Sequence, residues 1–353
     1  MSDLLHYYRG RVALHAILHG LGVTPGDEVV VQAYTCAAVV EPLLRLGAKP
    51  VFTDIDPYTF GPDPQLIRSA VTKRTKAVVV QHTFGIPAPV HLIGAGVPVV
   101  EDCAHVVPGT LDTTGSVAAF YSYEWGKPVV AGVGGTAVVH DQVLAARMGT
   151  QYDWTTAPPW KRELMTGAEY LAYRMAARTG TLWRLRGLHR RLAGRGVVVG
   201  SYVPDPFLSP EYGWRMSRAV RRRLPSRVVG GRASLDRRRR VAAAYHLALT
   251  RAGLRHATAS LPLRIPVVVA DKDRVLREGA AAGVELGDWF ATAVHPLDGP
   301  ALAATGYRAG SCPHAEWAAA HVVTLPVRAA TSPAEISRTV HLLAHLEKTR
   351  VAV

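Results

Sequence analysis

The first 140 residues alternate between short apolar runs and a stretch with helical spacing. In that stretch, residues 12–21, apolar side chains recur on one helix face, at Leu14, Ile17, Leu18 and Leu21. The short runs are apolar at nearly every position, as in strands that are buried on both faces of a parallel sheet. They occupy residues 29–31, 50–52, 77–80, 97–100, 118–121 and 136–139. This alternation predicts an α/β fold in which helices cross over between mostly parallel strands.

The pattern weakens in the middle of the chain. Residues 154–195 predict a helical region with poor patterning, and residues 196–210 predict a loop. Residues 216–250 predict a long helical stretch, interrupted near Pro225 and near residues 230–231, because proline and glycine are poor residues for a helix interior.

Strand and helix patterns return beyond Gly253. They cover residues 263–269, 274–282, 322–327 and 333–348. The chain shows no internal repeat and no low-complexity linker. At 353 residues it is long enough for two cores. We therefore predict a large α/β domain of residues 1–230 and a smaller C-terminal α/β domain of residues 231–353.

Reactive side chains follow the ends of several predicted strands. His82, Asp102 and Ser122 each stand at such an end, and Lys127 comes five residues after Ser122. Ligand sites of open α/β sheets lie beyond the carboxyl ends of the strands, so one shared pocket is predicted. A lysine amine that forms a Schiff base and a carboxylate that keeps the pyridine nitrogen protonated are what pyridoxal phosphate chemistry needs. The chain has only seven lysines, which favours this interpretation over a solvated Lys127 and a strand-capping Asp102.

Around these residues the chain resembles the DegT/StrS-type sugar aminotransferases, which are fold-type I pyridoxal phosphate enzymes. The family's Glu-Asp-x-Ala-(His/Gln), Phe-Ser-x-x-x-x-Lys and Gly-Gly segments correspond to residues 101–105, 121–127 and 134–135. Weaker similarities follow in the family's order at residues 10–14, 25–29, 46–56, 72–77, 212–217 and 325–327. The resemblance implies an aspartate aminotransferase-like fold and pyridoxal 5'-phosphate as the cofactor.

The resemblance also implies a role for each residue of the pocket. Lys127 corresponds to the Schiff-base lysine, which also moves the proton during transamination. Asp102 corresponds to the partner of the pyridine nitrogen. His105 corresponds to the residue beside the phenolic oxygen, the alternative being a structural histidine.

The resemblance places the cofactor phosphate at Ser122 and at the helix start around Arg11 and Val12. A helix N-terminus suits a phosphate, because its first N–H groups are unpaired and its dipole favours negative charge. The Arg11 side chain could add a charge-assisted bond, or it could point elsewhere.

Three features depart from the family pattern. Cys36 stands where the family has an aromatic residue that stacks on the pyridine ring, so the stacking surface is either this cysteine or Tyr34. Gly213 replaces an asparagine that reaches the phosphate of the partner subunit's cofactor. Residues 89–96 are shorter than the usual helix at that place. These departures predict a divergent member of the family.

Composition narrows the setting of the protein. No run approaches the roughly 18 apolar residues of a membrane span, and the N-terminus lacks the pattern of a secretion signal. Three scattered cysteines predict neither a disulfide framework nor a metal site. We therefore expect a cytoplasmic protein with no membrane partner and no metal.

The formal net charge of +14 comes mainly from arginines between residues 162 and 240. Exposed helix faces of an arginine-rich protein are the simplest explanation, and attraction of an anionic, nucleotide-linked substrate is the second. Aromatic residues do not alternate with these arginines and no nucleic-acid motif is present, so a nucleic-acid partner is not expected.

The sequence thus predicts an aminotransferase that moves an amino group from L-glutamate or L-glutamine to a keto group. By resemblance, the acceptor is a nucleotide-linked keto sugar of secondary-metabolite (antibiotic) or cell-surface sugar biosynthesis. The alternatives are a non-nucleotide ketone or aldehyde such as a cyclitol, a related sugar dehydration, or a cofactor-binding regulator. Retention of Lys127 counts against dehydration, and no Gly-x-Gly-x-x-Gly strand-to-helix turn supports a dinucleotide fold.

The resemblance further implies a homodimer with shared active sites, because residues 212–216 match the family segment that crosses to the partner. Trp214 or Arg215 could replace the missing asparagine contact. Loops carry acceptor specificity, and here we expect residues 83–87, 152–160 and 289–295 to form the acceptor pocket.

Overall fold

A computed structural model of the chain describes residues 3–94, 96–178, 209–259 and 261–349. Its centre is a seven-stranded sheet with the order β1-β8-β7-β6-β5-β2-β4. Its strands are β1 (Asp3–Tyr7), β2 (Glu28–Gln32), β4 (Lys49–Thr53), β5 (Thr75–Gln81), β6 (Val99–Asp102), β7 (Ala118–Ser122) and β8 (Gly135–Val139). Five strands, which lie in the sheet in the order β7-β6-β5-β2-β4, pair in parallel. Strand β8 pairs antiparallel with both of its neighbours, β1 and β7. The predicted, mostly parallel α/β sheet is confirmed.

Among the seven strands of the central sheet, only the edge strand β1 was not predicted from the hydrophobic pattern. Its first two residues are exposed, and Leu4 is 60% exposed, so β1 lacks the continuous apolar character of the central strands. Its pairing with β8 compensates for this through backbone hydrogen bonds, which place no demand on the side chains.

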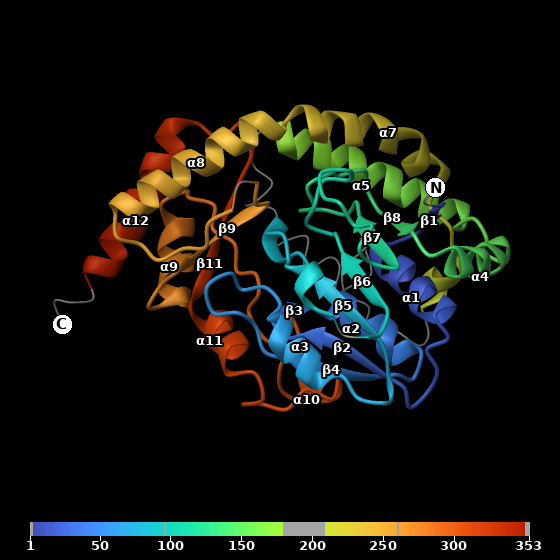
Figure 1. Ribbon diagram of the computed structural model, residues 1–353. Helices are drawn as coiled ribbons and strands as arrows, with labels where there is room; N and C mark the ends of the chain where they lie inside the picture. Colours follow the sequence, from blue (N-terminus) through green and yellow to red (C-terminus); the bar gives the residue numbers. More distant parts are fainter. Residues whose placement is uncertain (1–2, 95, 179–208, 260, 350–353) are drawn as a thin grey trace.

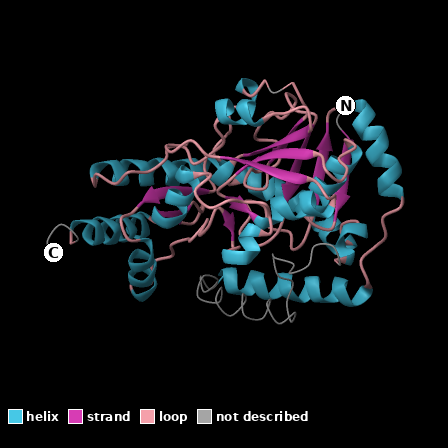
Figure 2. Cartoon of the chain, turned by 90° about the horizontal axis from the view of Figure 1, so that it is seen from below, coloured by secondary structure: helices cyan, strands magenta, loops and turns pink. Residues whose placement is uncertain are grey.

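Helices cover both faces of the central sheet (Figures 1 and 2). On one face lie α1 (Gly10–Gly20), α2 (Ala37–Arg45) and α4 (Gln142–Asp153), and α1 contacts β7, β8 and both of the other helices. The side chains of Val29, Val31 and Val100 belong to this core. On the other face, Val30 and Val78 pack with Ile67 of α3 (Pro64–Ala70). Adjacent residues therefore point into different cores, as the two-residue period of a strand requires.

Two long helices cross the top of the molecule in Figure 1, α7 (Arg218–Ala233) and α8 (Leu235–Arg251), above α5 (Trp160–Arg178). The predicted interruptions at Pro225 and at residues 230–231 are wrong, because α7 runs through all three and ends at Ala233, with Ser234 as its C-cap. Pro225 is exposed, and a Cβ on Gly231 would lie 2.9 Å from a methyl group of Val129. The glycine thus serves close packing rather than a break. Residues 179–195 of the predicted helical region and residues 196–208 of the predicted loop lie outside the described residues.

The C-terminal region has its own small antiparallel sheet, formed by β9 (Arg264–Val268) and β11 (Val322–Pro326). These strands share a hydrophobic core with α8, α9 (Lys272–Ala281) and α12 (Pro333–Lys348). The segment between them also carries α10 (Gly299–Ala303) and α11 (Pro313–His321). This agrees with the strand and helix pattern that the sequence shows beyond Gly253.

A second connection joins the C-terminal region to the main sheet. The two-residue strand β10 (Val294–His295) pairs in parallel with β3 (Thr35–Cys36), directly before α2. Around this pair, Phe290 and Val294 share a core with Tyr34 and Phe84. Residues from both predicted domains therefore meet beside the ends of the central strands.

Three single turns of 3-10 helix complete the described elements, at Thr83–Gly85, Val90–Leu92 and Pro210–Gly213. The second of these turns lies where the sequence predicted a shortened segment, residues 89–96. No helix in the described part of the chain combines the length and the apolar character needed to cross a membrane.

Candidate active site

Asp102 ends β6 and is buried with 3% of its surface exposed. Its Oδ1 accepts a hydrogen bond of 2.9 Å from the backbone N–H of Ala104, and its own carbonyl accepts from the N–H of His82. Burial raises the pKa of this carboxyl, while the Lys127 ammonium and the Ala104 N–H act in the opposite direction. A buried carboxylate in this state is stabilised by any positive group that binds next to it.

His105 lies three residues further on and is also buried. Its Nδ1 accepts a hydrogen bond of 3.1 Å from the backbone N–H of Phe84, so the neutral ring carries its proton on Nε2. Burial lowers the pKa of His105 well below its usual value, and the cations Lys127 and Arg264 act in the same direction. The ring is therefore a neutral donor at physiological pH. No hydrogen-bond acceptor for its Nε2 is found among the described residues.

Lys127 follows β7 on a tight turn, in which its N–H donates to the carbonyl of Glu124. Its side chain is half-buried, and Nζ lies 6.0 Å from the ring centre of Trp289. The charge of Lys127 influences the pKa of Asp102, His105 and Cys36, so these three side chains lie within electrostatic reach of its amine. The structure thus brings together four of the residues predicted from the sequence.

The start of α1 forms a cradle beside this point. A Cβ on Gly10 would lie 2.9 Å from Cβ of Ser122, and a Cβ on Gly135 would lie 2.3 Å from the carbonyl carbon of Arg9. Only glycine at these two positions lets β7 and β8 approach the first turn of the helix so closely. No side chain caps this turn. Its free N–H groups, with the Ser122 hydroxyl beside them, can therefore hold a phosphate.

The two predicted residues of this turn differ in what they offer. Val12 has a side chain buried in the main core, so its contact with a phosphate would be through the backbone N–H. The Arg11 side chain forms a buried ion pair with Glu41 of α2, whose other oxygen accepts from the Tyr212 hydroxyl at 3.1 Å. The arginine is thus held toward α2, and its backbone N–H is the group directed to the cradle.

Cys36, at the end of β3, is the side chain that replaces the expected aromatic stack. Burial raises the pKa of its thiol, and the Lys127 charge opposes this effect. The alternative, Tyr34, is fully buried and packs edge-on against Phe290 at a ring-centre distance of 5.2 Å. Tyr34 therefore has no ring face to offer a cofactor, and Cys36 is the residue that borders the pocket.

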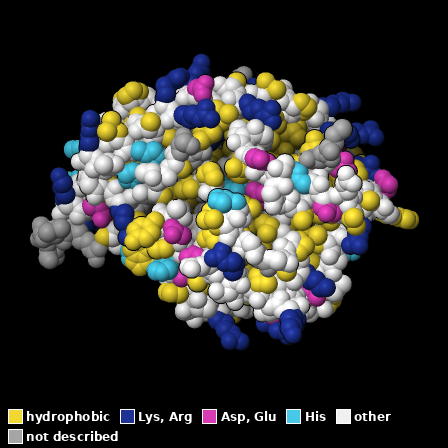
Figure 3. Space-filling view, in the orientation of Figure 1, with side chains coloured by type: hydrophobic (Ala, Val, Ile, Leu, Met, Phe, Trp, Pro, Cys, Tyr) yellow, Lys and Arg dark blue, Asp and Glu magenta, His cyan; other side chains and the backbone are white. Residues whose placement is uncertain are grey.

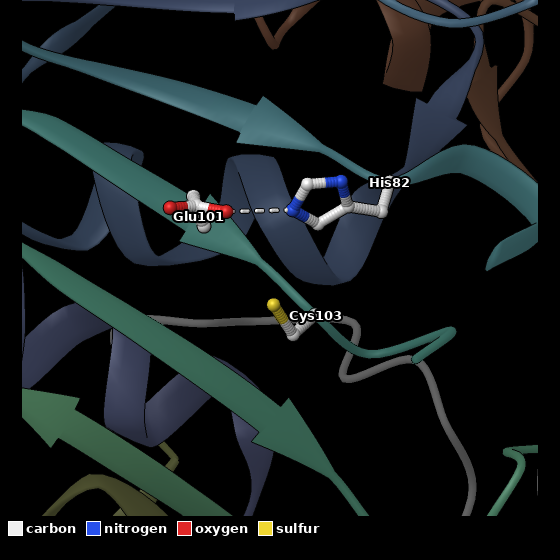
Figure 4. Close-up of side chains that lie close together, drawn as sticks. All are labelled: His82, Glu101 and Cys103. Carbon is white, nitrogen blue, oxygen red and sulfur yellow. Dashed lines mark hydrogen bonds and ion pairs between the residues drawn. The ribbon is translucent and has the colours of Figure 1, made fainter. Parts of the chain in front are cut away.

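His82 does not join the site, although it too follows a strand end. Its ring points to the opposite face of the sheet, where Glu101 and Cys103 lie (Figure 4). Its Nε2 donates to Glu101 at 2.9 Å, because its Nδ1 accepts at 2.9 Å from the N–H of Ala88. Both ring nitrogens are thus engaged in hydrogen bonds.

A buried network of charges next to the site was missed by sequence reasoning. Arg9 pairs with Glu124 at 3.0 Å and with Glu211 at 2.6 Å, and Arg162 lies 3.5 Å from Glu211. Burial alone would raise the pKa of Glu124, but Arg9, Arg11 and Lys127 together lower it. Glu124 therefore stays charged three residues from the lysine. Its place in the Lys127 segment was the only signal in the sequence.

Trp289 closes the site from the C-terminal side. Its ring lies parallel to that of His105 at 5.8 Å, and the guanidinium of Arg264 lies 4.7 Å from its ring centre. We expected the loop of residues 289–295 to border the acceptor pocket. Trp289 is the residue of this loop whose ring lies beside His105. By contrast, Trp154 and Trp160 of the second predicted loop are 85% and 70% exposed.

The arginine-rich segments lie mostly on the surface. Four of the seven arginines at residues 221–223 and 237–240 are on exposed faces of α7 and α8 with no ion pair among the described residues. Figure 3 shows Lys and Arg side chains on several parts of one face of the molecule rather than in a single patch. The arginines between residues 184 and 195 lie outside the described residues.

Solved structures with this architecture are fold-type I aminotransferases. The chain matches DesI, solved with its TDP-sugar product, at 26% identity and a TM-score of 0.71 over 99% of the chain and 82% of DesI. It matches NtdA of Bacillus subtilis, solved with bound PMP, at 20% identity and a TM-score of 0.73 over 98% of the chain and 73% of that protein. The expected aspartate aminotransferase-like fold class is thus confirmed.

The family follows from the sequence match. The model of the DegT/DnrJ/EryC1/StrS aminotransferase family matches residues 8–176 and 233–344, and the chain belongs to this family. Membership implies pyridoxal phosphate as the cofactor. The residues present fit this group, because the uncapped first turn of α1, the buried Asp102 carboxylate and the unpaired Nε2–H of His105 surround Lys127.

The curated relatives match one part of the chain. A pleiotropic regulatory protein of Geobacillus stearothermophilus is 40% identical over 39% of the chain and 40% of its own length. A UDP-2-acetamido-2-deoxy-3-oxo-D-glucuronate aminotransferase of Pseudomonas aeruginosa is 39% identical over 38% of the chain and 41% of its length. An L-glutamine:2-deoxy-scyllo-inosose aminotransferase of Streptomyces lividus is 34% identical over 39% and 35%. The matched segments span about two fifths of these relatives.

Proposed function

We propose that the protein is an aminotransferase that moves an amino group from L-glutamate or L-glutamine to the keto group of a nucleotide-linked sugar. The observation that carries this proposal is the convergence of Asp102, His105 and Cys36 on Lys127, beside the uncapped start of α1. Bound pyridoxal phosphate supplies an electron sink for the negative charge that develops on the substrate carbon.

Each side chain of the pocket has a task that its surroundings support. Lys127 holds the cofactor and then, as a neutral amine, takes and returns the proton of the substrate carbon. Asp102 holds the pyridine nitrogen in its protonated form, and that cation in turn relieves the cost of burying the carboxylate. His105 donates from Nε2 to the ring oxygen, since its Nδ1 is already used. Ser122 and the N–H groups of α1 bind the phosphate.

The nature of the keto acceptor has two candidates. The glucuronate aminotransferase of Pseudomonas aeruginosa has a nucleotide-linked acceptor in its name, which supports a nucleotide-linked sugar. The inosose aminotransferase of Streptomyces lividus supports a cyclitol that carries no nucleotide. The basic character of the chain, with its formal net charge of +14, suits the anionic acceptor better.

Spectroscopy of the purified protein tests this function. The bound cofactor should give a visible absorption band that disappears when L-glutamate or L-glutamine is added and returns with a keto acceptor. A panel of nucleotide-linked keto sugars and inososes, read out by mass spectrometry of the amine product, separates the two acceptor classes. A visible band that no amino donor changes would contradict the proposal. It would favour the regulatory role suggested by the name of the Geobacillus relative.

We also propose that the protein acts as a homodimer with shared sites. A stripe of exposed apolar side chains on α5 supports a partner surface, and it consists of Trp160, Leu164, Leu171 and Met175. Residues 212–216 are held on their own chain by β1, through the bonds Tyr8 N–H to Trp214 and Met216 N–H to His6. They therefore reach the surface in a fixed position.

Hybrid dimers test the shared sites. Lys127→Ala subunits are mixed with subunits that carry Trp214→Ala and Arg215→Ala, each inactive alone. Hybrids should regain activity in one of two pockets, since one pocket then receives an intact residue from each subunit. A monomer in solution, or no recovery in verified hybrids, would contradict this arrangement.

A further inference from the structure

Trp289 is in contact with the reactive part of the pocket. Its indole lies parallel to the His105 ring, with an interplanar angle of 7°. On the other side of the pocket, a Cβ on Gly126 would lie 3.1 Å from Cη2 of the same indole. Gly126 directly precedes Lys127, so the turn that carries the lysine packs against Trp289. A displacement of this indole would therefore disturb the packing of both the His105 ring and the turn that carries Lys127.

Lys272 fixes the backbone on both sides of Trp289. Its buried ammonium donates three hydrogen bonds: to the carbonyl of Asp288 at 3.2 Å, of Phe290 at 2.9 Å and of Ala319 at 2.8 Å. All three of its N–H donors are thus used, as a buried ammonium requires. The carbonyl of Trp289 itself accepts from the Tyr34 hydroxyl at 3.4 Å. The backbone carbonyls of Asp288, Trp289 and Phe290 thus accept hydrogen bonds from two different side chains, Lys272 and Tyr34.

The clamp joins three elements of the C-terminal region. Lys272 belongs to the first turn of α9, whose cap is the side chain of Asp271. Ala319 lies near the end of α11, and the third element is the segment with Trp289. The lysine side chain therefore ties this segment to the frame of the C-terminal region.

The surroundings of Lys272 make the clamp sensitive to pH. Burial lowers the pKa of its ammonium to about 8, against the effect of the nearby carboxylates Asp288 and Asp273. A cavity of about 570 Å³ adjoins it, to which Asp271 and Arg274 also contribute, while α11 contributes only alanines. Water can thus reach the amine. Once neutral, the amine keeps two N–H donors for three carbonyls.

We propose that Lys272 is a positioning residue, which clamps the backbone on both sides of Trp289 and so holds the indole against His105 and the Lys127 turn. The part of this inference that concerns catalysis rests on the proposed aminotransferase function. In the described part of the chain no hydrogen bond joins Lys272 to Asp102, His105 or Lys127, so it acts on the site through the segment with Trp289. The clamp aligns the acceptor side of the pocket.

Three variants test the clamp. Lys272→Met has similar length but no donor, Lys272→Arg keeps donors and charge, and Lys73→Met removes an exposed lysine as the matched control. Hydrogen exchange followed by mass spectrometry measures the backbone of residues 288–291. We expect faster exchange there in Lys272→Met, recovery in Lys272→Arg and no change in Lys73→Met. Unchanged exchange in Lys272→Met would overturn the clamp, with or without turnover.

Kinetics test what the clamp does. In Lys272→Met, kcat/KM for the keto acceptor should fall about 10- to 100-fold, the cost of a reacting group displaced by about 1 Å. Borohydride labelling of Lys127 by the cofactor should stay complete. In the wild type, kcat/KM should also fall as the pH rises through about 8, and Lys272→Arg should lack this decline, because its guanidinium stays charged. Full kcat/KM in Lys272→Met despite faster exchange would overturn the positioning role. Absence of turnover in the wild type would instead contradict the proposed function, and the exchange result would still decide the clamp.

Discussion

Two histidine–carboxylate clusters lie on opposite faces of the sheet at the end of β6. On one face His82 pairs with Glu101, and on the other His105 lies near Asp102. Both histidines accept a backbone N–H at Nδ1, so both carry the proton on Nε2. The two histidines differ in the acceptor for this proton. His82 donates to Glu101, whereas no hydrogen-bond acceptor for Nε2 of His105 is found among the described residues.

This difference separates a structural cluster from a binding site. In the cluster of His82 and Glu101, both ring nitrogens of the histidine already have hydrogen-bond partners. Around Lys127, by contrast, the buried Asp102 carboxylate accepts one backbone hydrogen bond, and burial raises its pKa, so keeping it charged costs free energy in the empty protein. Binding of the cofactor recovers this cost. Adjacent residues of one strand, Glu101 and Asp102, thus have opposite roles because their side chains alternate.

The largest expected effect comes from Lys127, which belongs to the open cluster alone. Lys127→Ala should lower kcat by more than about 1,000-fold, because the amine holds the cofactor and moves the proton. Borohydride reduction of the wild type, followed by peptide mapping, should place the pyridoxyl group on Lys127. The informative competitor is Lys272, a second buried amine with a pKa of about 8. A label on Lys272 would show that the site is wrongly assigned.

Asp102→Asn should have the next largest effect. It should lower activity but raise the thermal stability of the apoprotein at pH 7. The kcat should fall about 100- to 1,000-fold, since a charge beside the reacting ring is lost. Because burial raises the pKa of Asp102, the folded apoprotein binds this proton more tightly than the unfolded chain does. The wild type therefore gains stability from this group as the pH falls from neutral, and the variant does not. Thermal unfolding of the apoproteins should thus give a higher Tm for Asp102→Asn at pH 7. A lower Tm for Asp102→Asn than for the wild type at pH 7 would contradict the conclusion that the buried, charged carboxylate destabilises the folded apoprotein.

The closed cluster should show the reverse behaviour. Glu101→Leu leaves the buried Nε2–H of His82 without an acceptor, which should lower the free energy of unfolding by about 1–3 kcal/mol. Glu101→Gln keeps an acceptor oxygen and serves as the control with a smaller loss. Urea titration measures both, and kcat of the folded variants should stay within about twofold of the wild type. A large loss of kcat in Glu101→Gln would mean that the two faces are not separate.

The smallest expected effect concerns Gly213, where the family has an asparagine. A Cβ at this exposed position would meet no atom within 4 Å in its own chain, so Gly213→Asn should be tolerated. If the segment reaches the partner's cofactor, the new amide should strengthen cofactor binding about two- to fivefold, the worth of one hydrogen bond. Equilibrium dialysis measures the Kd, with Gly149→Asn as a control at another open position. Equal affinities in all three proteins would argue against the crossing segment.

The central sheet could be predicted because its strands are buried on both faces and therefore read as continuous apolar runs. The edge strand β1 could not, since Leu4 is exposed and the pairing of β1 depends on backbone bonds. Gly231 was misinterpreted as a helix break, although its small size serves packing against Val129. A glycine in a sequence does not show whether it supplies flexibility or space.

The core of the site could be predicted from motifs, because Asp102, His105 and Lys127 lie within one short stretch of sequence. The assignment of His82 to the pocket was wrong, since a residue just after a strand end can turn to either face. The pairs of Arg9 with Glu124 and Glu211 join residues 115 and 202 positions apart, and Lys272 binds only backbone carbonyls. Such contacts leave no local pattern, and only the fold shows them.

The short pairing of β10 with β3 has a consequence for the order of events during synthesis. All seven strands of the main sheet are encoded before residue 140, so this sheet can assemble while the rest of the chain is still on the ribosome. Cys36 gains its neighbour His295 only after every strand of the main sheet has been made. Lys127 and the phosphate cradle at the start of α1 are thus synthesised long before Trp289. The cradle can thus fold first, and the segment with Trp289 then packs beside it.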